Sequence, residues 1–320
     1  MSAPGTLQAE AKARPAASRA AVLFRTHMWD DFIERQYQRV LQQAEDCDVF
    51  IMAHNTSGQC NDIPHDRVIL FTEDDVLGLG LARAGEGDLL WYNVDYAFYY
   101  FHKQNPQYEL VVIVEYDVVL NLSLSQVVSH CRDNDIDLLG LEKGISVANW
   151  VWTQACLDLY TIDELRKLLL PFGVVSGRLL AHLFQKRLDH SRAFIEGKLT
   201  QWPICEAFIP TEADRSGFKI GQLSEIGSTE HFDFAPAIFE GDMPALQGEA
   251  FLHPVLDTDR YIRSRLKFEH RTEKFLVPGS RQHQDLSRFP LRAYRSPLMQ
   301  ALKNRVGRLL QQRLRILSPR

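Results

Sequence analysis

One stretch of the sequence constrains the fold more than any other, the run Tyr108-Glu-Leu-Val-Val-Ile-Val-Glu-Tyr-Asp-Val-Val-Leu120. Its Val- and Ile-rich part is long enough for a fully buried strand, which is typical of a parallel sheet covered on both faces. The apolar run stops at Glu115-Tyr116-Asp117. Because strand side chains alternate between faces, Glu115 and Asp117 are expected to point the same way at the end of this strand.

Two carboxylates that share one side of a strand end need partners, because burying both charges unpaired is prohibitively costly. A hard divalent cation is the usual partner of paired carboxylate oxygens. The alternative is that both acids face water or a nearby arginine. The strand by itself leaves the two interpretations open.

In the first half of the chain, short apolar segments alternate with segments of helical periodicity. Further strands are predicted at 20–24, 48–54, 67–71 and 136–140, and helices at 28–45, 88–105 and 124–131. This alternation predicts an α/β fold with a mostly parallel central sheet and helices on both faces. Ligands of such sheets bind at the carboxyl ends of the strands. Arg25, His54 or Asn55, and the acids of 115–117 all follow predicted strands, which favours a binding site at that edge.

The second half is less regular. Helices are predicted at 162–170, 178–185 and 257–270, with a further helix starting at 201–208. Segment 172–177 is predicted as a turn or strand, 218–221 and 250–255 as strands, and 230–248 as a loop.

Length and cysteine content restrict the class of protein. A chain of 320 residues is long enough for one large domain or two smaller ones. It contains no apolar run of the roughly 18 residues that span a bilayer. The five scattered cysteines form no CxxC pair, so neither a disulfide framework nor a zinc site is indicated, and a cytoplasmic location is expected. We expect a disordered leader at 1–19, a single domain at 20–270 and a basic tail at 271–320.

The tail differs in charge from the rest of the chain. Residues 276–320 contain ten Lys and Arg and one acid, a net charge of +9, which leaves −14 for residues 1–275 from the total of −5. Residues 296–317 are predicted to form a basic amphipathic helix, which suits an anionic membrane surface. The alternatives are a helix docked on the acidic body or a dimer contact. Nucleic-acid binding is not expected, because few aromatic residues are interleaved with the basic ones and the body is acidic.

The order of these features resembles nucleotide-sugar-dependent glycosyltransferases of the GT-A type. A strand with Arg25 is followed by a helix, two strands, an aromatic helix with Asp95 and the strand that ends in Glu115-Tyr116-Asp117. The family carries a DxD motif at the end of a central strand, often with Glu at one position, and the triplet here matches the variant ExD. The segments Trp202-Pro203…Glu206-Ala207-Phe208 and His253-Pro254-Val255 are similar to the second half of such enzymes. The resemblance spans roughly residues 20–260.

The resemblance implies transfer of a sugar from a nucleotide-sugar donor to a glycan or lipid-linked acceptor, with Mn²⁺ or Mg²⁺ as cofactor. By this resemblance Asp117 binds the metal, Glu115 binds the donor ribose or sugar, and His253 is a further metal ligand. Imidazole suits Mn²⁺ better than Mg²⁺. The alternative for His253 is a strand-end histidine bonded to the backbone.

Other residues have an expected role and a plainer alternative. Arg25 and Thr26 are expected to hold the nucleotide, since a guanidinium pairs well with phosphate, but Arg25 is equally suited to a surface ion pair. Asp95 is expected to bind a base or ribose, or to cap a helix turn. Trp150 and Trp152 are candidates for stacking on a sugar ring or for core packing.

An inverting enzyme needs a general base that takes the proton of the acceptor hydroxyl. Glu206 is the candidate for this role, because it opens a helix behind the apolar residues Trp202 and Ile204. Glu212 and Asp214 are its rivals, and each of the three acids has the alternative of an ordinary solvated helix charge.

Two other functions are compatible with parts of this pattern. A metal-dependent phosphoester hydrolase could be built on Glu115, Asp117 and His253, but no second cluster of acids and histidines is apparent for a two-metal site. A non-catalytic relative that binds a nucleotide or glycan would keep the fold, but has no reason to keep the ExD triplet, His253 and Glu206 together.

Overall fold

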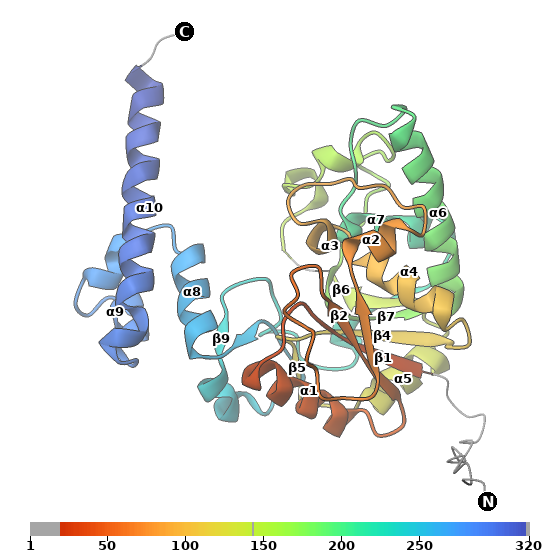
Figure 1. Cartoon of the computed structure of the whole chain (residues 1–320), viewed down its shortest axis with the longest axis horizontal. Helices are drawn as coiled ribbons and strands as arrows, with labels where there is room; N and C mark the ends of the chain where they lie inside the picture. Colours follow the sequence, from red (N-terminus) through yellow and green to blue (C-terminus); the bar gives the residue numbers. More distant parts are fainter. Residues whose placement is uncertain (1–19, 143, 318–320) are drawn as a thin grey trace, which may run out of the picture.

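The computed structural model describes residues 20–142 and 144–317, so the predicted leader at 1–19 lies outside the described residues. A seven-stranded sheet with the order β3-β2-β1-β4-β7-β6-β8 forms its centre (Figure 1). Within residues 20–142 and 144–317, β7 is the only strand of this sheet that runs antiparallel to its neighbours. The prediction of an α/β fold with a mostly parallel sheet is therefore confirmed. The strands are β1 (Ala20–Thr26), β2 (Asp48–His54), β3 (Val68–Phe71), β4 (Leu110–Glu115), β6 (Leu138–Leu141), β7 (Leu169–Ser176) and β8 (Ile220–Gln222).

Helices cover both faces of the sheet, which explains why β1 and β4 are continuously apolar. Ala21 and Leu23 of β1 belong to one hydrophobic cluster, which includes residues of α4, α6 and α7. Val22 and Phe24 belong to a second cluster, which includes residues of α1 and α5. The helices are α1 (Asp31–Gln43), α2 (Glu73–Leu77), α3 (Leu89–Tyr92), α4 (Asp95–Gln104), α5 (Leu124–Asp133), α6 (Gly177–Ile195), α7 (Cys205–Arg215), α8 (Thr258–Phe268), α9 (Arg281–Ser287) and α10 (Leu291–Leu317).

Two predicted helices differ from the structure. Residues 162–170 do not form the predicted helix, because β7 begins at Leu169 and continues through Pro171. The pairing of β6 with β7 is irregular between Leu139 and Leu141, and a proline is tolerated at such an irregularity because the ladder there lacks a hydrogen bond. The predicted helix at 88–105 is two helices, α3 and α4. They separate at Asn93, whose side-chain amide donates to the carbonyl oxygens of Ala84 and Leu89.

Two short strand pairs lie beside the sheet and position His253. β10 (Phe251–Leu252) pairs with β5 (Val119–Leu120), and β11 (Val255–Leu256) pairs with β9 (Ile238–Phe239). The backbone N–H of Val255 donates to the carbonyl oxygen of Asp117 at 2.8 Å. These pairings hold the His253-Pro254 segment against the end of β4.

The C-terminal helices share a separate hydrophobic cluster. It includes Tyr261, Ile262 and Leu266 of α8, Phe275, Leu286 of α9 and Leu298 of α10, so the predicted boundary at residue 270 falls inside it. The predicted apolar stripe at 296–317 is divided, because Leu298 is buried whereas Met299, Val306 and Leu310 are exposed. Figure 1 shows α10 extending well beyond the other helices, away from the sheet. Among the helices of 20–142 and 144–317, none has the length and apolarity of a bilayer span.

Candidate active site

The site lies where β1 and β4 end side by side. The two strands are parallel, and Arg25 is in register with Glu115. The Arg25 guanidinium donates from Nη2 to Glu115 Oε1 and from Nη1 to the carbonyl oxygen of Leu90, the latter at 3.2 Å. Glu115 thus has a nearby arginine as its partner, which is one of the alternatives left open by the sequence.

Asp117 and His253 make a less usual contact. Asp117 Oδ1 lies 3.6 Å from His253 Nε2, and the two side chains are only 14% and 10% exposed. Asp117 Oδ1 is buried without a hydrogen-bond partner in the described part of the chain. His253 Nδ1 lies 2.6 Å from the carbonyl oxygen of Asp233, so this nitrogen carries the proton. In the neutral imidazole, Nε2 then presents a lone pair to the carboxylate.

Two acceptor atoms that face each other in a buried place are suited to a cation between them. One ligand atom each of Glu115, Asp117 and His253 lies within 4.8 Å of the others. A histidine that donates from its other nitrogen to a carbonyl is typical of metal ligands, because this hydrogen bond fixes the tautomer. The pKa of Asp117 is raised to about 6, mainly by burial and with a contribution from Glu115, against the opposing effect of His253. The residues thus fit a divalent cation with mixed oxygen and nitrogen ligands.

Glu206 lies at the same edge of the sheet. β7 is antiparallel to β4, so it begins where the parallel strands end, and the Leu168 N–H donates to the carbonyl oxygen of Glu206 at 3.0 Å. The pKa of the Glu206 carboxyl is raised to about 7, mainly by burial and with a contribution from Glu115, while the backbone N–H of Leu170 and the charge of Lys167 oppose the shift. A carboxyl with this pKa can accept or release a proton near neutral pH.

The rivals of Glu206 lie elsewhere on α7. Glu212 is buried, with its Oε2 3.9 Å from Lys186 Nζ. Asp214 forms a half-exposed ion pair with Arg166 at 2.8 Å. Of the three acids, Glu206 alone is electrostatically coupled to Glu115 in the described part of the chain.

Two predicted nucleotide-binding residues do not reach this site, and these predictions need correction. Asp95 is 1% exposed and accepts from Arg187 Nε at 2.7 Å and from the Tyr99 hydroxyl at 3.0 Å, so its carboxylate is occupied inside the core. Thr26 is 2% exposed, and its hydroxyl donates to the Met28 carbonyl oxygen at 2.6 Å. Its side chain stabilises the turn after β1 and does not face a ligand.

The predicted tryptophan pair is half-buried. Trp150 and Trp152 both pack against the hydrophobic cluster on one face of the sheet, which agrees with the core-packing alternative. The ring centroid of Trp152 lies 5.4 Å from that of Tyr92 and 6.0 Å from that of Trp91. Trp91 was not singled out from the sequence and is 56% exposed.

Sequence reasoning missed three polar residues near the edge. His27 follows β1, its ring centroid lies 5.5 Å from that of Tyr116, and burial and then Arg25 lower its pKa. Asp88 interacts electrostatically with His27. The position of His27 just after a predicted strand is a signal by which His27 could have been found from the sequence. Lys167 is 8% exposed and interacts with Glu206, but its segment was predicted as helix, so nothing in the sequence placed it at this edge.

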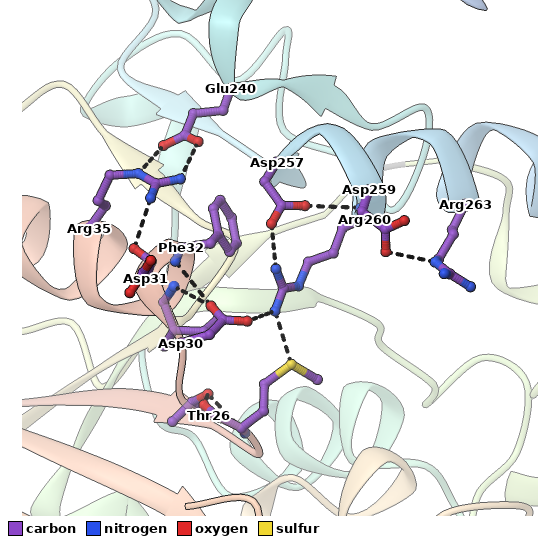
Figure 2. A network of polar contacts seen from close by, with 12 residues as sticks. Thr26, Asp30, Asp31, Phe32, Arg35, Glu240, Asp257, Asp259, Arg260 and Arg263 are labelled. Carbon is purple, nitrogen blue, oxygen red and sulfur yellow. Dashed lines mark hydrogen bonds and ion pairs between the residues drawn. The ribbon is translucent and has the colours of Figure 1, made fainter. Parts of the chain in front are cut away.

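Polar contacts fasten the segment after His253 to the segment after β1 (Figure 2). The Arg260 guanidinium bonds to the carboxylates of Asp30 and Asp257 and stacks over the Phe32 ring at 4.9 Å. Beside it, Arg35 pairs with Glu240 at 2.9 Å. These contacts hold the two sides of the site together at their outer ends.

Comparison with known proteins found similar structures only. No family model matches this sequence, and no curated protein matches it. Among the solved structures that align with the chain, mouse xyloside xylosyltransferase 1 in its apo form is 10% identical, with a TM-score of 0.41 over 74% of this chain and 97% of that one. The apo structure of the bifunctional glycosyltransferase WbbM is 12% identical, with a TM-score of 0.39 over 75% of this chain and 46% of that one. The galactosyltransferase LgtC, in complex with donor and acceptor sugar analogs, is 10% identical, with a TM-score of 0.38 over 71% of this chain and 78% of that one.

All three of these proteins are described as glycosyltransferases. This chain spans less than half of the WbbM chain. At TM-scores below 0.5 the alignments carry no information on the activity of this chain, which has to be inferred from its own residues.

Proposed function

We propose that this protein is a metal-dependent glycosyltransferase, which moves a sugar from a nucleotide-sugar donor to a glycan or lipid-linked acceptor. The observation that carries the proposal is the contact of Asp117 with His253. A buried carboxylate oxygen of Asp117 without a hydrogen-bond partner lies 3.6 Å from Nε2 of His253, at the end of a central strand. A divalent cation resolves this contact, and a diphosphate is a ligand that such a cation commonly binds.

Asp117 and His253 would hold the metal, with Glu115 beside it. The bound metal would neutralise the charge that develops on the diphosphate leaving group. Mn²⁺ is favoured over Mg²⁺, because one of the two principal ligands is an imidazole nitrogen.

Arg25 and Glu115 are assigned to the donor. They form a partly buried ion pair at the end of β1 and β4, next to the proposed metal ligands. A guanidinium held by a carboxylate keeps a fixed orientation, and its remaining N–H groups can donate to phosphate or ribose oxygens.

Glu206 is assigned the role of general base in an inverting reaction. Its carboxylate would accept the proton of the acceptor hydroxyl as that oxygen attacks the sugar. With a pKa of about 7, the group is largely ionised above neutral pH and still basic enough to take the proton. We expect the rate of transfer to rise with pH up to about 7 and to lose this dependence in Glu206→Gln.

The experiment that tests the proposal is a thermal-shift screen of the full chain with UDP, GDP, CMP and their sugars, each with and without Mn²⁺. A ligand that binds only the native state raises the unfolding temperature by mass action. We expect one diphosphate nucleotide to raise it in the presence of Mn²⁺ only, and we expect Asp117→Ala and His253→Ala to abolish this rise.

A matched control is available in the same chain. His231 lies beside Glu230 and Glu249 in a second group of potential metal ligands, but all three lie outside the strand ends that form the site. His231→Ala should leave the Mn²⁺-dependent shift unchanged. If the shift were lost in His231→Ala and retained in His253→Ala, the metal would have to be assigned to the group that contains His231. No shift with any nucleotide would contradict the proposal.

A further inference from the structure

The C-terminal helix α10 has an unusual composition. Its 27 residues contain seven Lys and Arg and no Asp or Glu. By contrast, residues 1–275 carry a net charge of about −14 from the totals given above. A cationic helix on an acidic protein suits a binding partner that is itself anionic.

One side of α10 is already used within the protein. Leu298 is buried in the C-terminal hydrophobic cluster, and Ala301 and Leu302 pack against it. Arg305 lies on this side as well, with its Nε 3.8 Å from Glu273. The helix is therefore fixed by its inner side and presents the opposite side to solvent.

The outer side combines cations with apolar residues. Positions 292, 295, 299, 303, 306 and 310 lie within about one quarter of the helical circumference at 3.6 residues per turn. Met299, Val306 and Leu310 are 51%, 56% and 57% exposed. Arg292, Arg295 and Lys303 are exposed too, and they make no ion pair within the described part of the chain. A groove between α8 and α10 adds Arg263 and Lys267 nearby.

We propose that this outer side of α10 binds the surface of an anionic phospholipid membrane. The cations would contact the phosphate groups, and the three exposed apolar side chains would enter the boundary between headgroups and acyl chains. The face that binds is not the stripe expected from the sequence, because part of that stripe faces the protein. It consists of Arg292, Arg295, Met299, Lys303, Val306 and Leu310.

Lipid is favoured over nucleic acid by the type of the exposed apolar residues. Met, Val and Leu suit hydrocarbon, whereas single-stranded nucleic acid is bound mainly with aromatic side chains that stack on bases. The position of α10 matters as well. It stands apart from the sheet (Figure 1), so the sheet domain does not cover it.

The test is co-sedimentation of the full chain with vesicles of phosphatidylcholine and phosphatidylglycerol, compared with vesicles of phosphatidylcholine alone. We expect binding to the anionic vesicles that weakens as salt is added. The variant Arg292→Gln/Arg295→Gln/Lys303→Gln should weaken it by roughly a hundredfold, since each cation near such a surface contributes about 1 kcal/mol. Met299→Ser/Val306→Ser/Leu310→Ser should weaken binding to anionic vesicles as well, and its residual binding should be more sensitive to salt.

A matched control removes the same charge from elsewhere. Arg83, Arg192 and Lys198 are exposed cations of the sheet domain, and the variant with Gln at all three should bind as the parent does. Equal loss in this control, or equal binding to vesicles without anionic lipid, would overturn the proposal. So would absence of vesicle binding together with dimerisation that the Met299, Val306 and Leu310 substitutions abolish. Each readout is independent of sugar transfer, so this proposal can fail while the proposed function stands.

Discussion

Two buried carboxylates in this protein have opposite surroundings. Asp95, the first residue of α4, accepts from Arg187 Nε at 2.7 Å and from the Tyr99 hydroxyl at 3.0 Å. Arg187 is itself fully buried and also donates to the Pro203 carbonyl oxygen at 3.2 Å. Asp117, at the end of β4, has an oxygen without a hydrogen-bond partner that faces Nε2 of His253. One acid is fully satisfied by the protein, and the other is not.

The difference separates a structural acid from a functional one. A buried charge whose partners are all supplied by the protein contributes to the packing of α4, α6 and the start of α7, and has no capacity left for a ligand. A buried carboxylate without a partner is costly, and such a cost is typical of a site that is completed by a ligand. Both residues looked like candidates for a site in the sequence, so it is the hydrogen-bond partners that distinguish them.

The largest expected effect is the difference in stability between two single variants, Asp95→Asn and Asp117→Asn. Asp95→Asn leaves the charge of Arg187 buried without a counterion, and we expect it to lower the free energy of unfolding by about 3–5 kcal/mol. Asp117→Asn should not destabilise the metal-free protein, because the new amide can donate to His253 Nε2 and one uncompensated charge is removed. Urea unfolding of the two variants and the parent, all without metal, measures the difference.

Equal destabilisation by the two substitutions would show that Asp117 has a structural partner after all, and would weaken its assignment as a metal ligand. The unchanged slope of the free energy against urea serves as the control that both variants unfold from the same compact state.

Much of the sheet was predictable from the sequence, because its strands are short apolar runs that are followed by polar residues. The β4 run was predicted, and the Glu115-Tyr116-Asp117 triplet lies at its end as expected. Segment 172–177 was predicted as a turn or strand, but the start of β7 was predicted as the end of a helix, because Pro171 resembles a helix stop; the pairing of β7 between β4 and β6 explains the strand.

The partners of the individual acids were not predictable, because they come from distant parts of the chain. Asp95 is separated by 92 positions from Arg187, and a buried arginine has no local signal in a helix that is otherwise amphipathic. Lys167 lies close to Glu206 only because β7 begins at the same edge as α7. Periodicity describes one element at a time and cannot give such contacts between elements.

Glu206 extends the comparison to a third acid, with a smaller expected effect. Its folded-state pKa is raised by burial to about 7 from the usual 4.5, so the folded protein holds this proton more tightly than the unfolded chain does. Its contribution to stability is therefore full below pH 4.5 and is lost as the pH rises through about 7. We expect Glu206→Gln to be more stable than the metal-free parent above pH 7, by on the order of 2 kcal/mol, and no more stable near pH 4.5.

Unfolding by urea at a series of pH values tests this expectation. Asp214→Asn is the matched control on the same helix, because Asp214 pairs with Arg166 near the surface and should show no such gain at high pH. If Glu206→Gln followed the parent at every pH, the carboxyl would have an ordinary pKa, and its assignment as a base that operates near pH 7 would be lost.

The smallest expected effect concerns two arginines drawn in Figure 2, which differ in burial and in the number of their partners. The Arg260 side chain is 20% exposed and contacts Asp30, Asp257 and the Phe32 ring. Arg263, one turn further along α8, is 65% exposed, and among the described residues its ion pair is with Asp259 alone. We expect Arg260→Met to lower the free energy of unfolding by about 1–2 kcal/mol, since it removes the cation that pairs with both Asp30 and Asp257. Arg263→Met should change it by less than about 0.5 kcal/mol, because exposed pairs contribute little.

Because Arg260 also links the segments on either side of the site, its loss should weaken Mn²⁺-dependent nucleotide binding, and Arg263→Met should not. Equal effects of the two substitutions on binding would show that the network stabilises α8 without positioning the site.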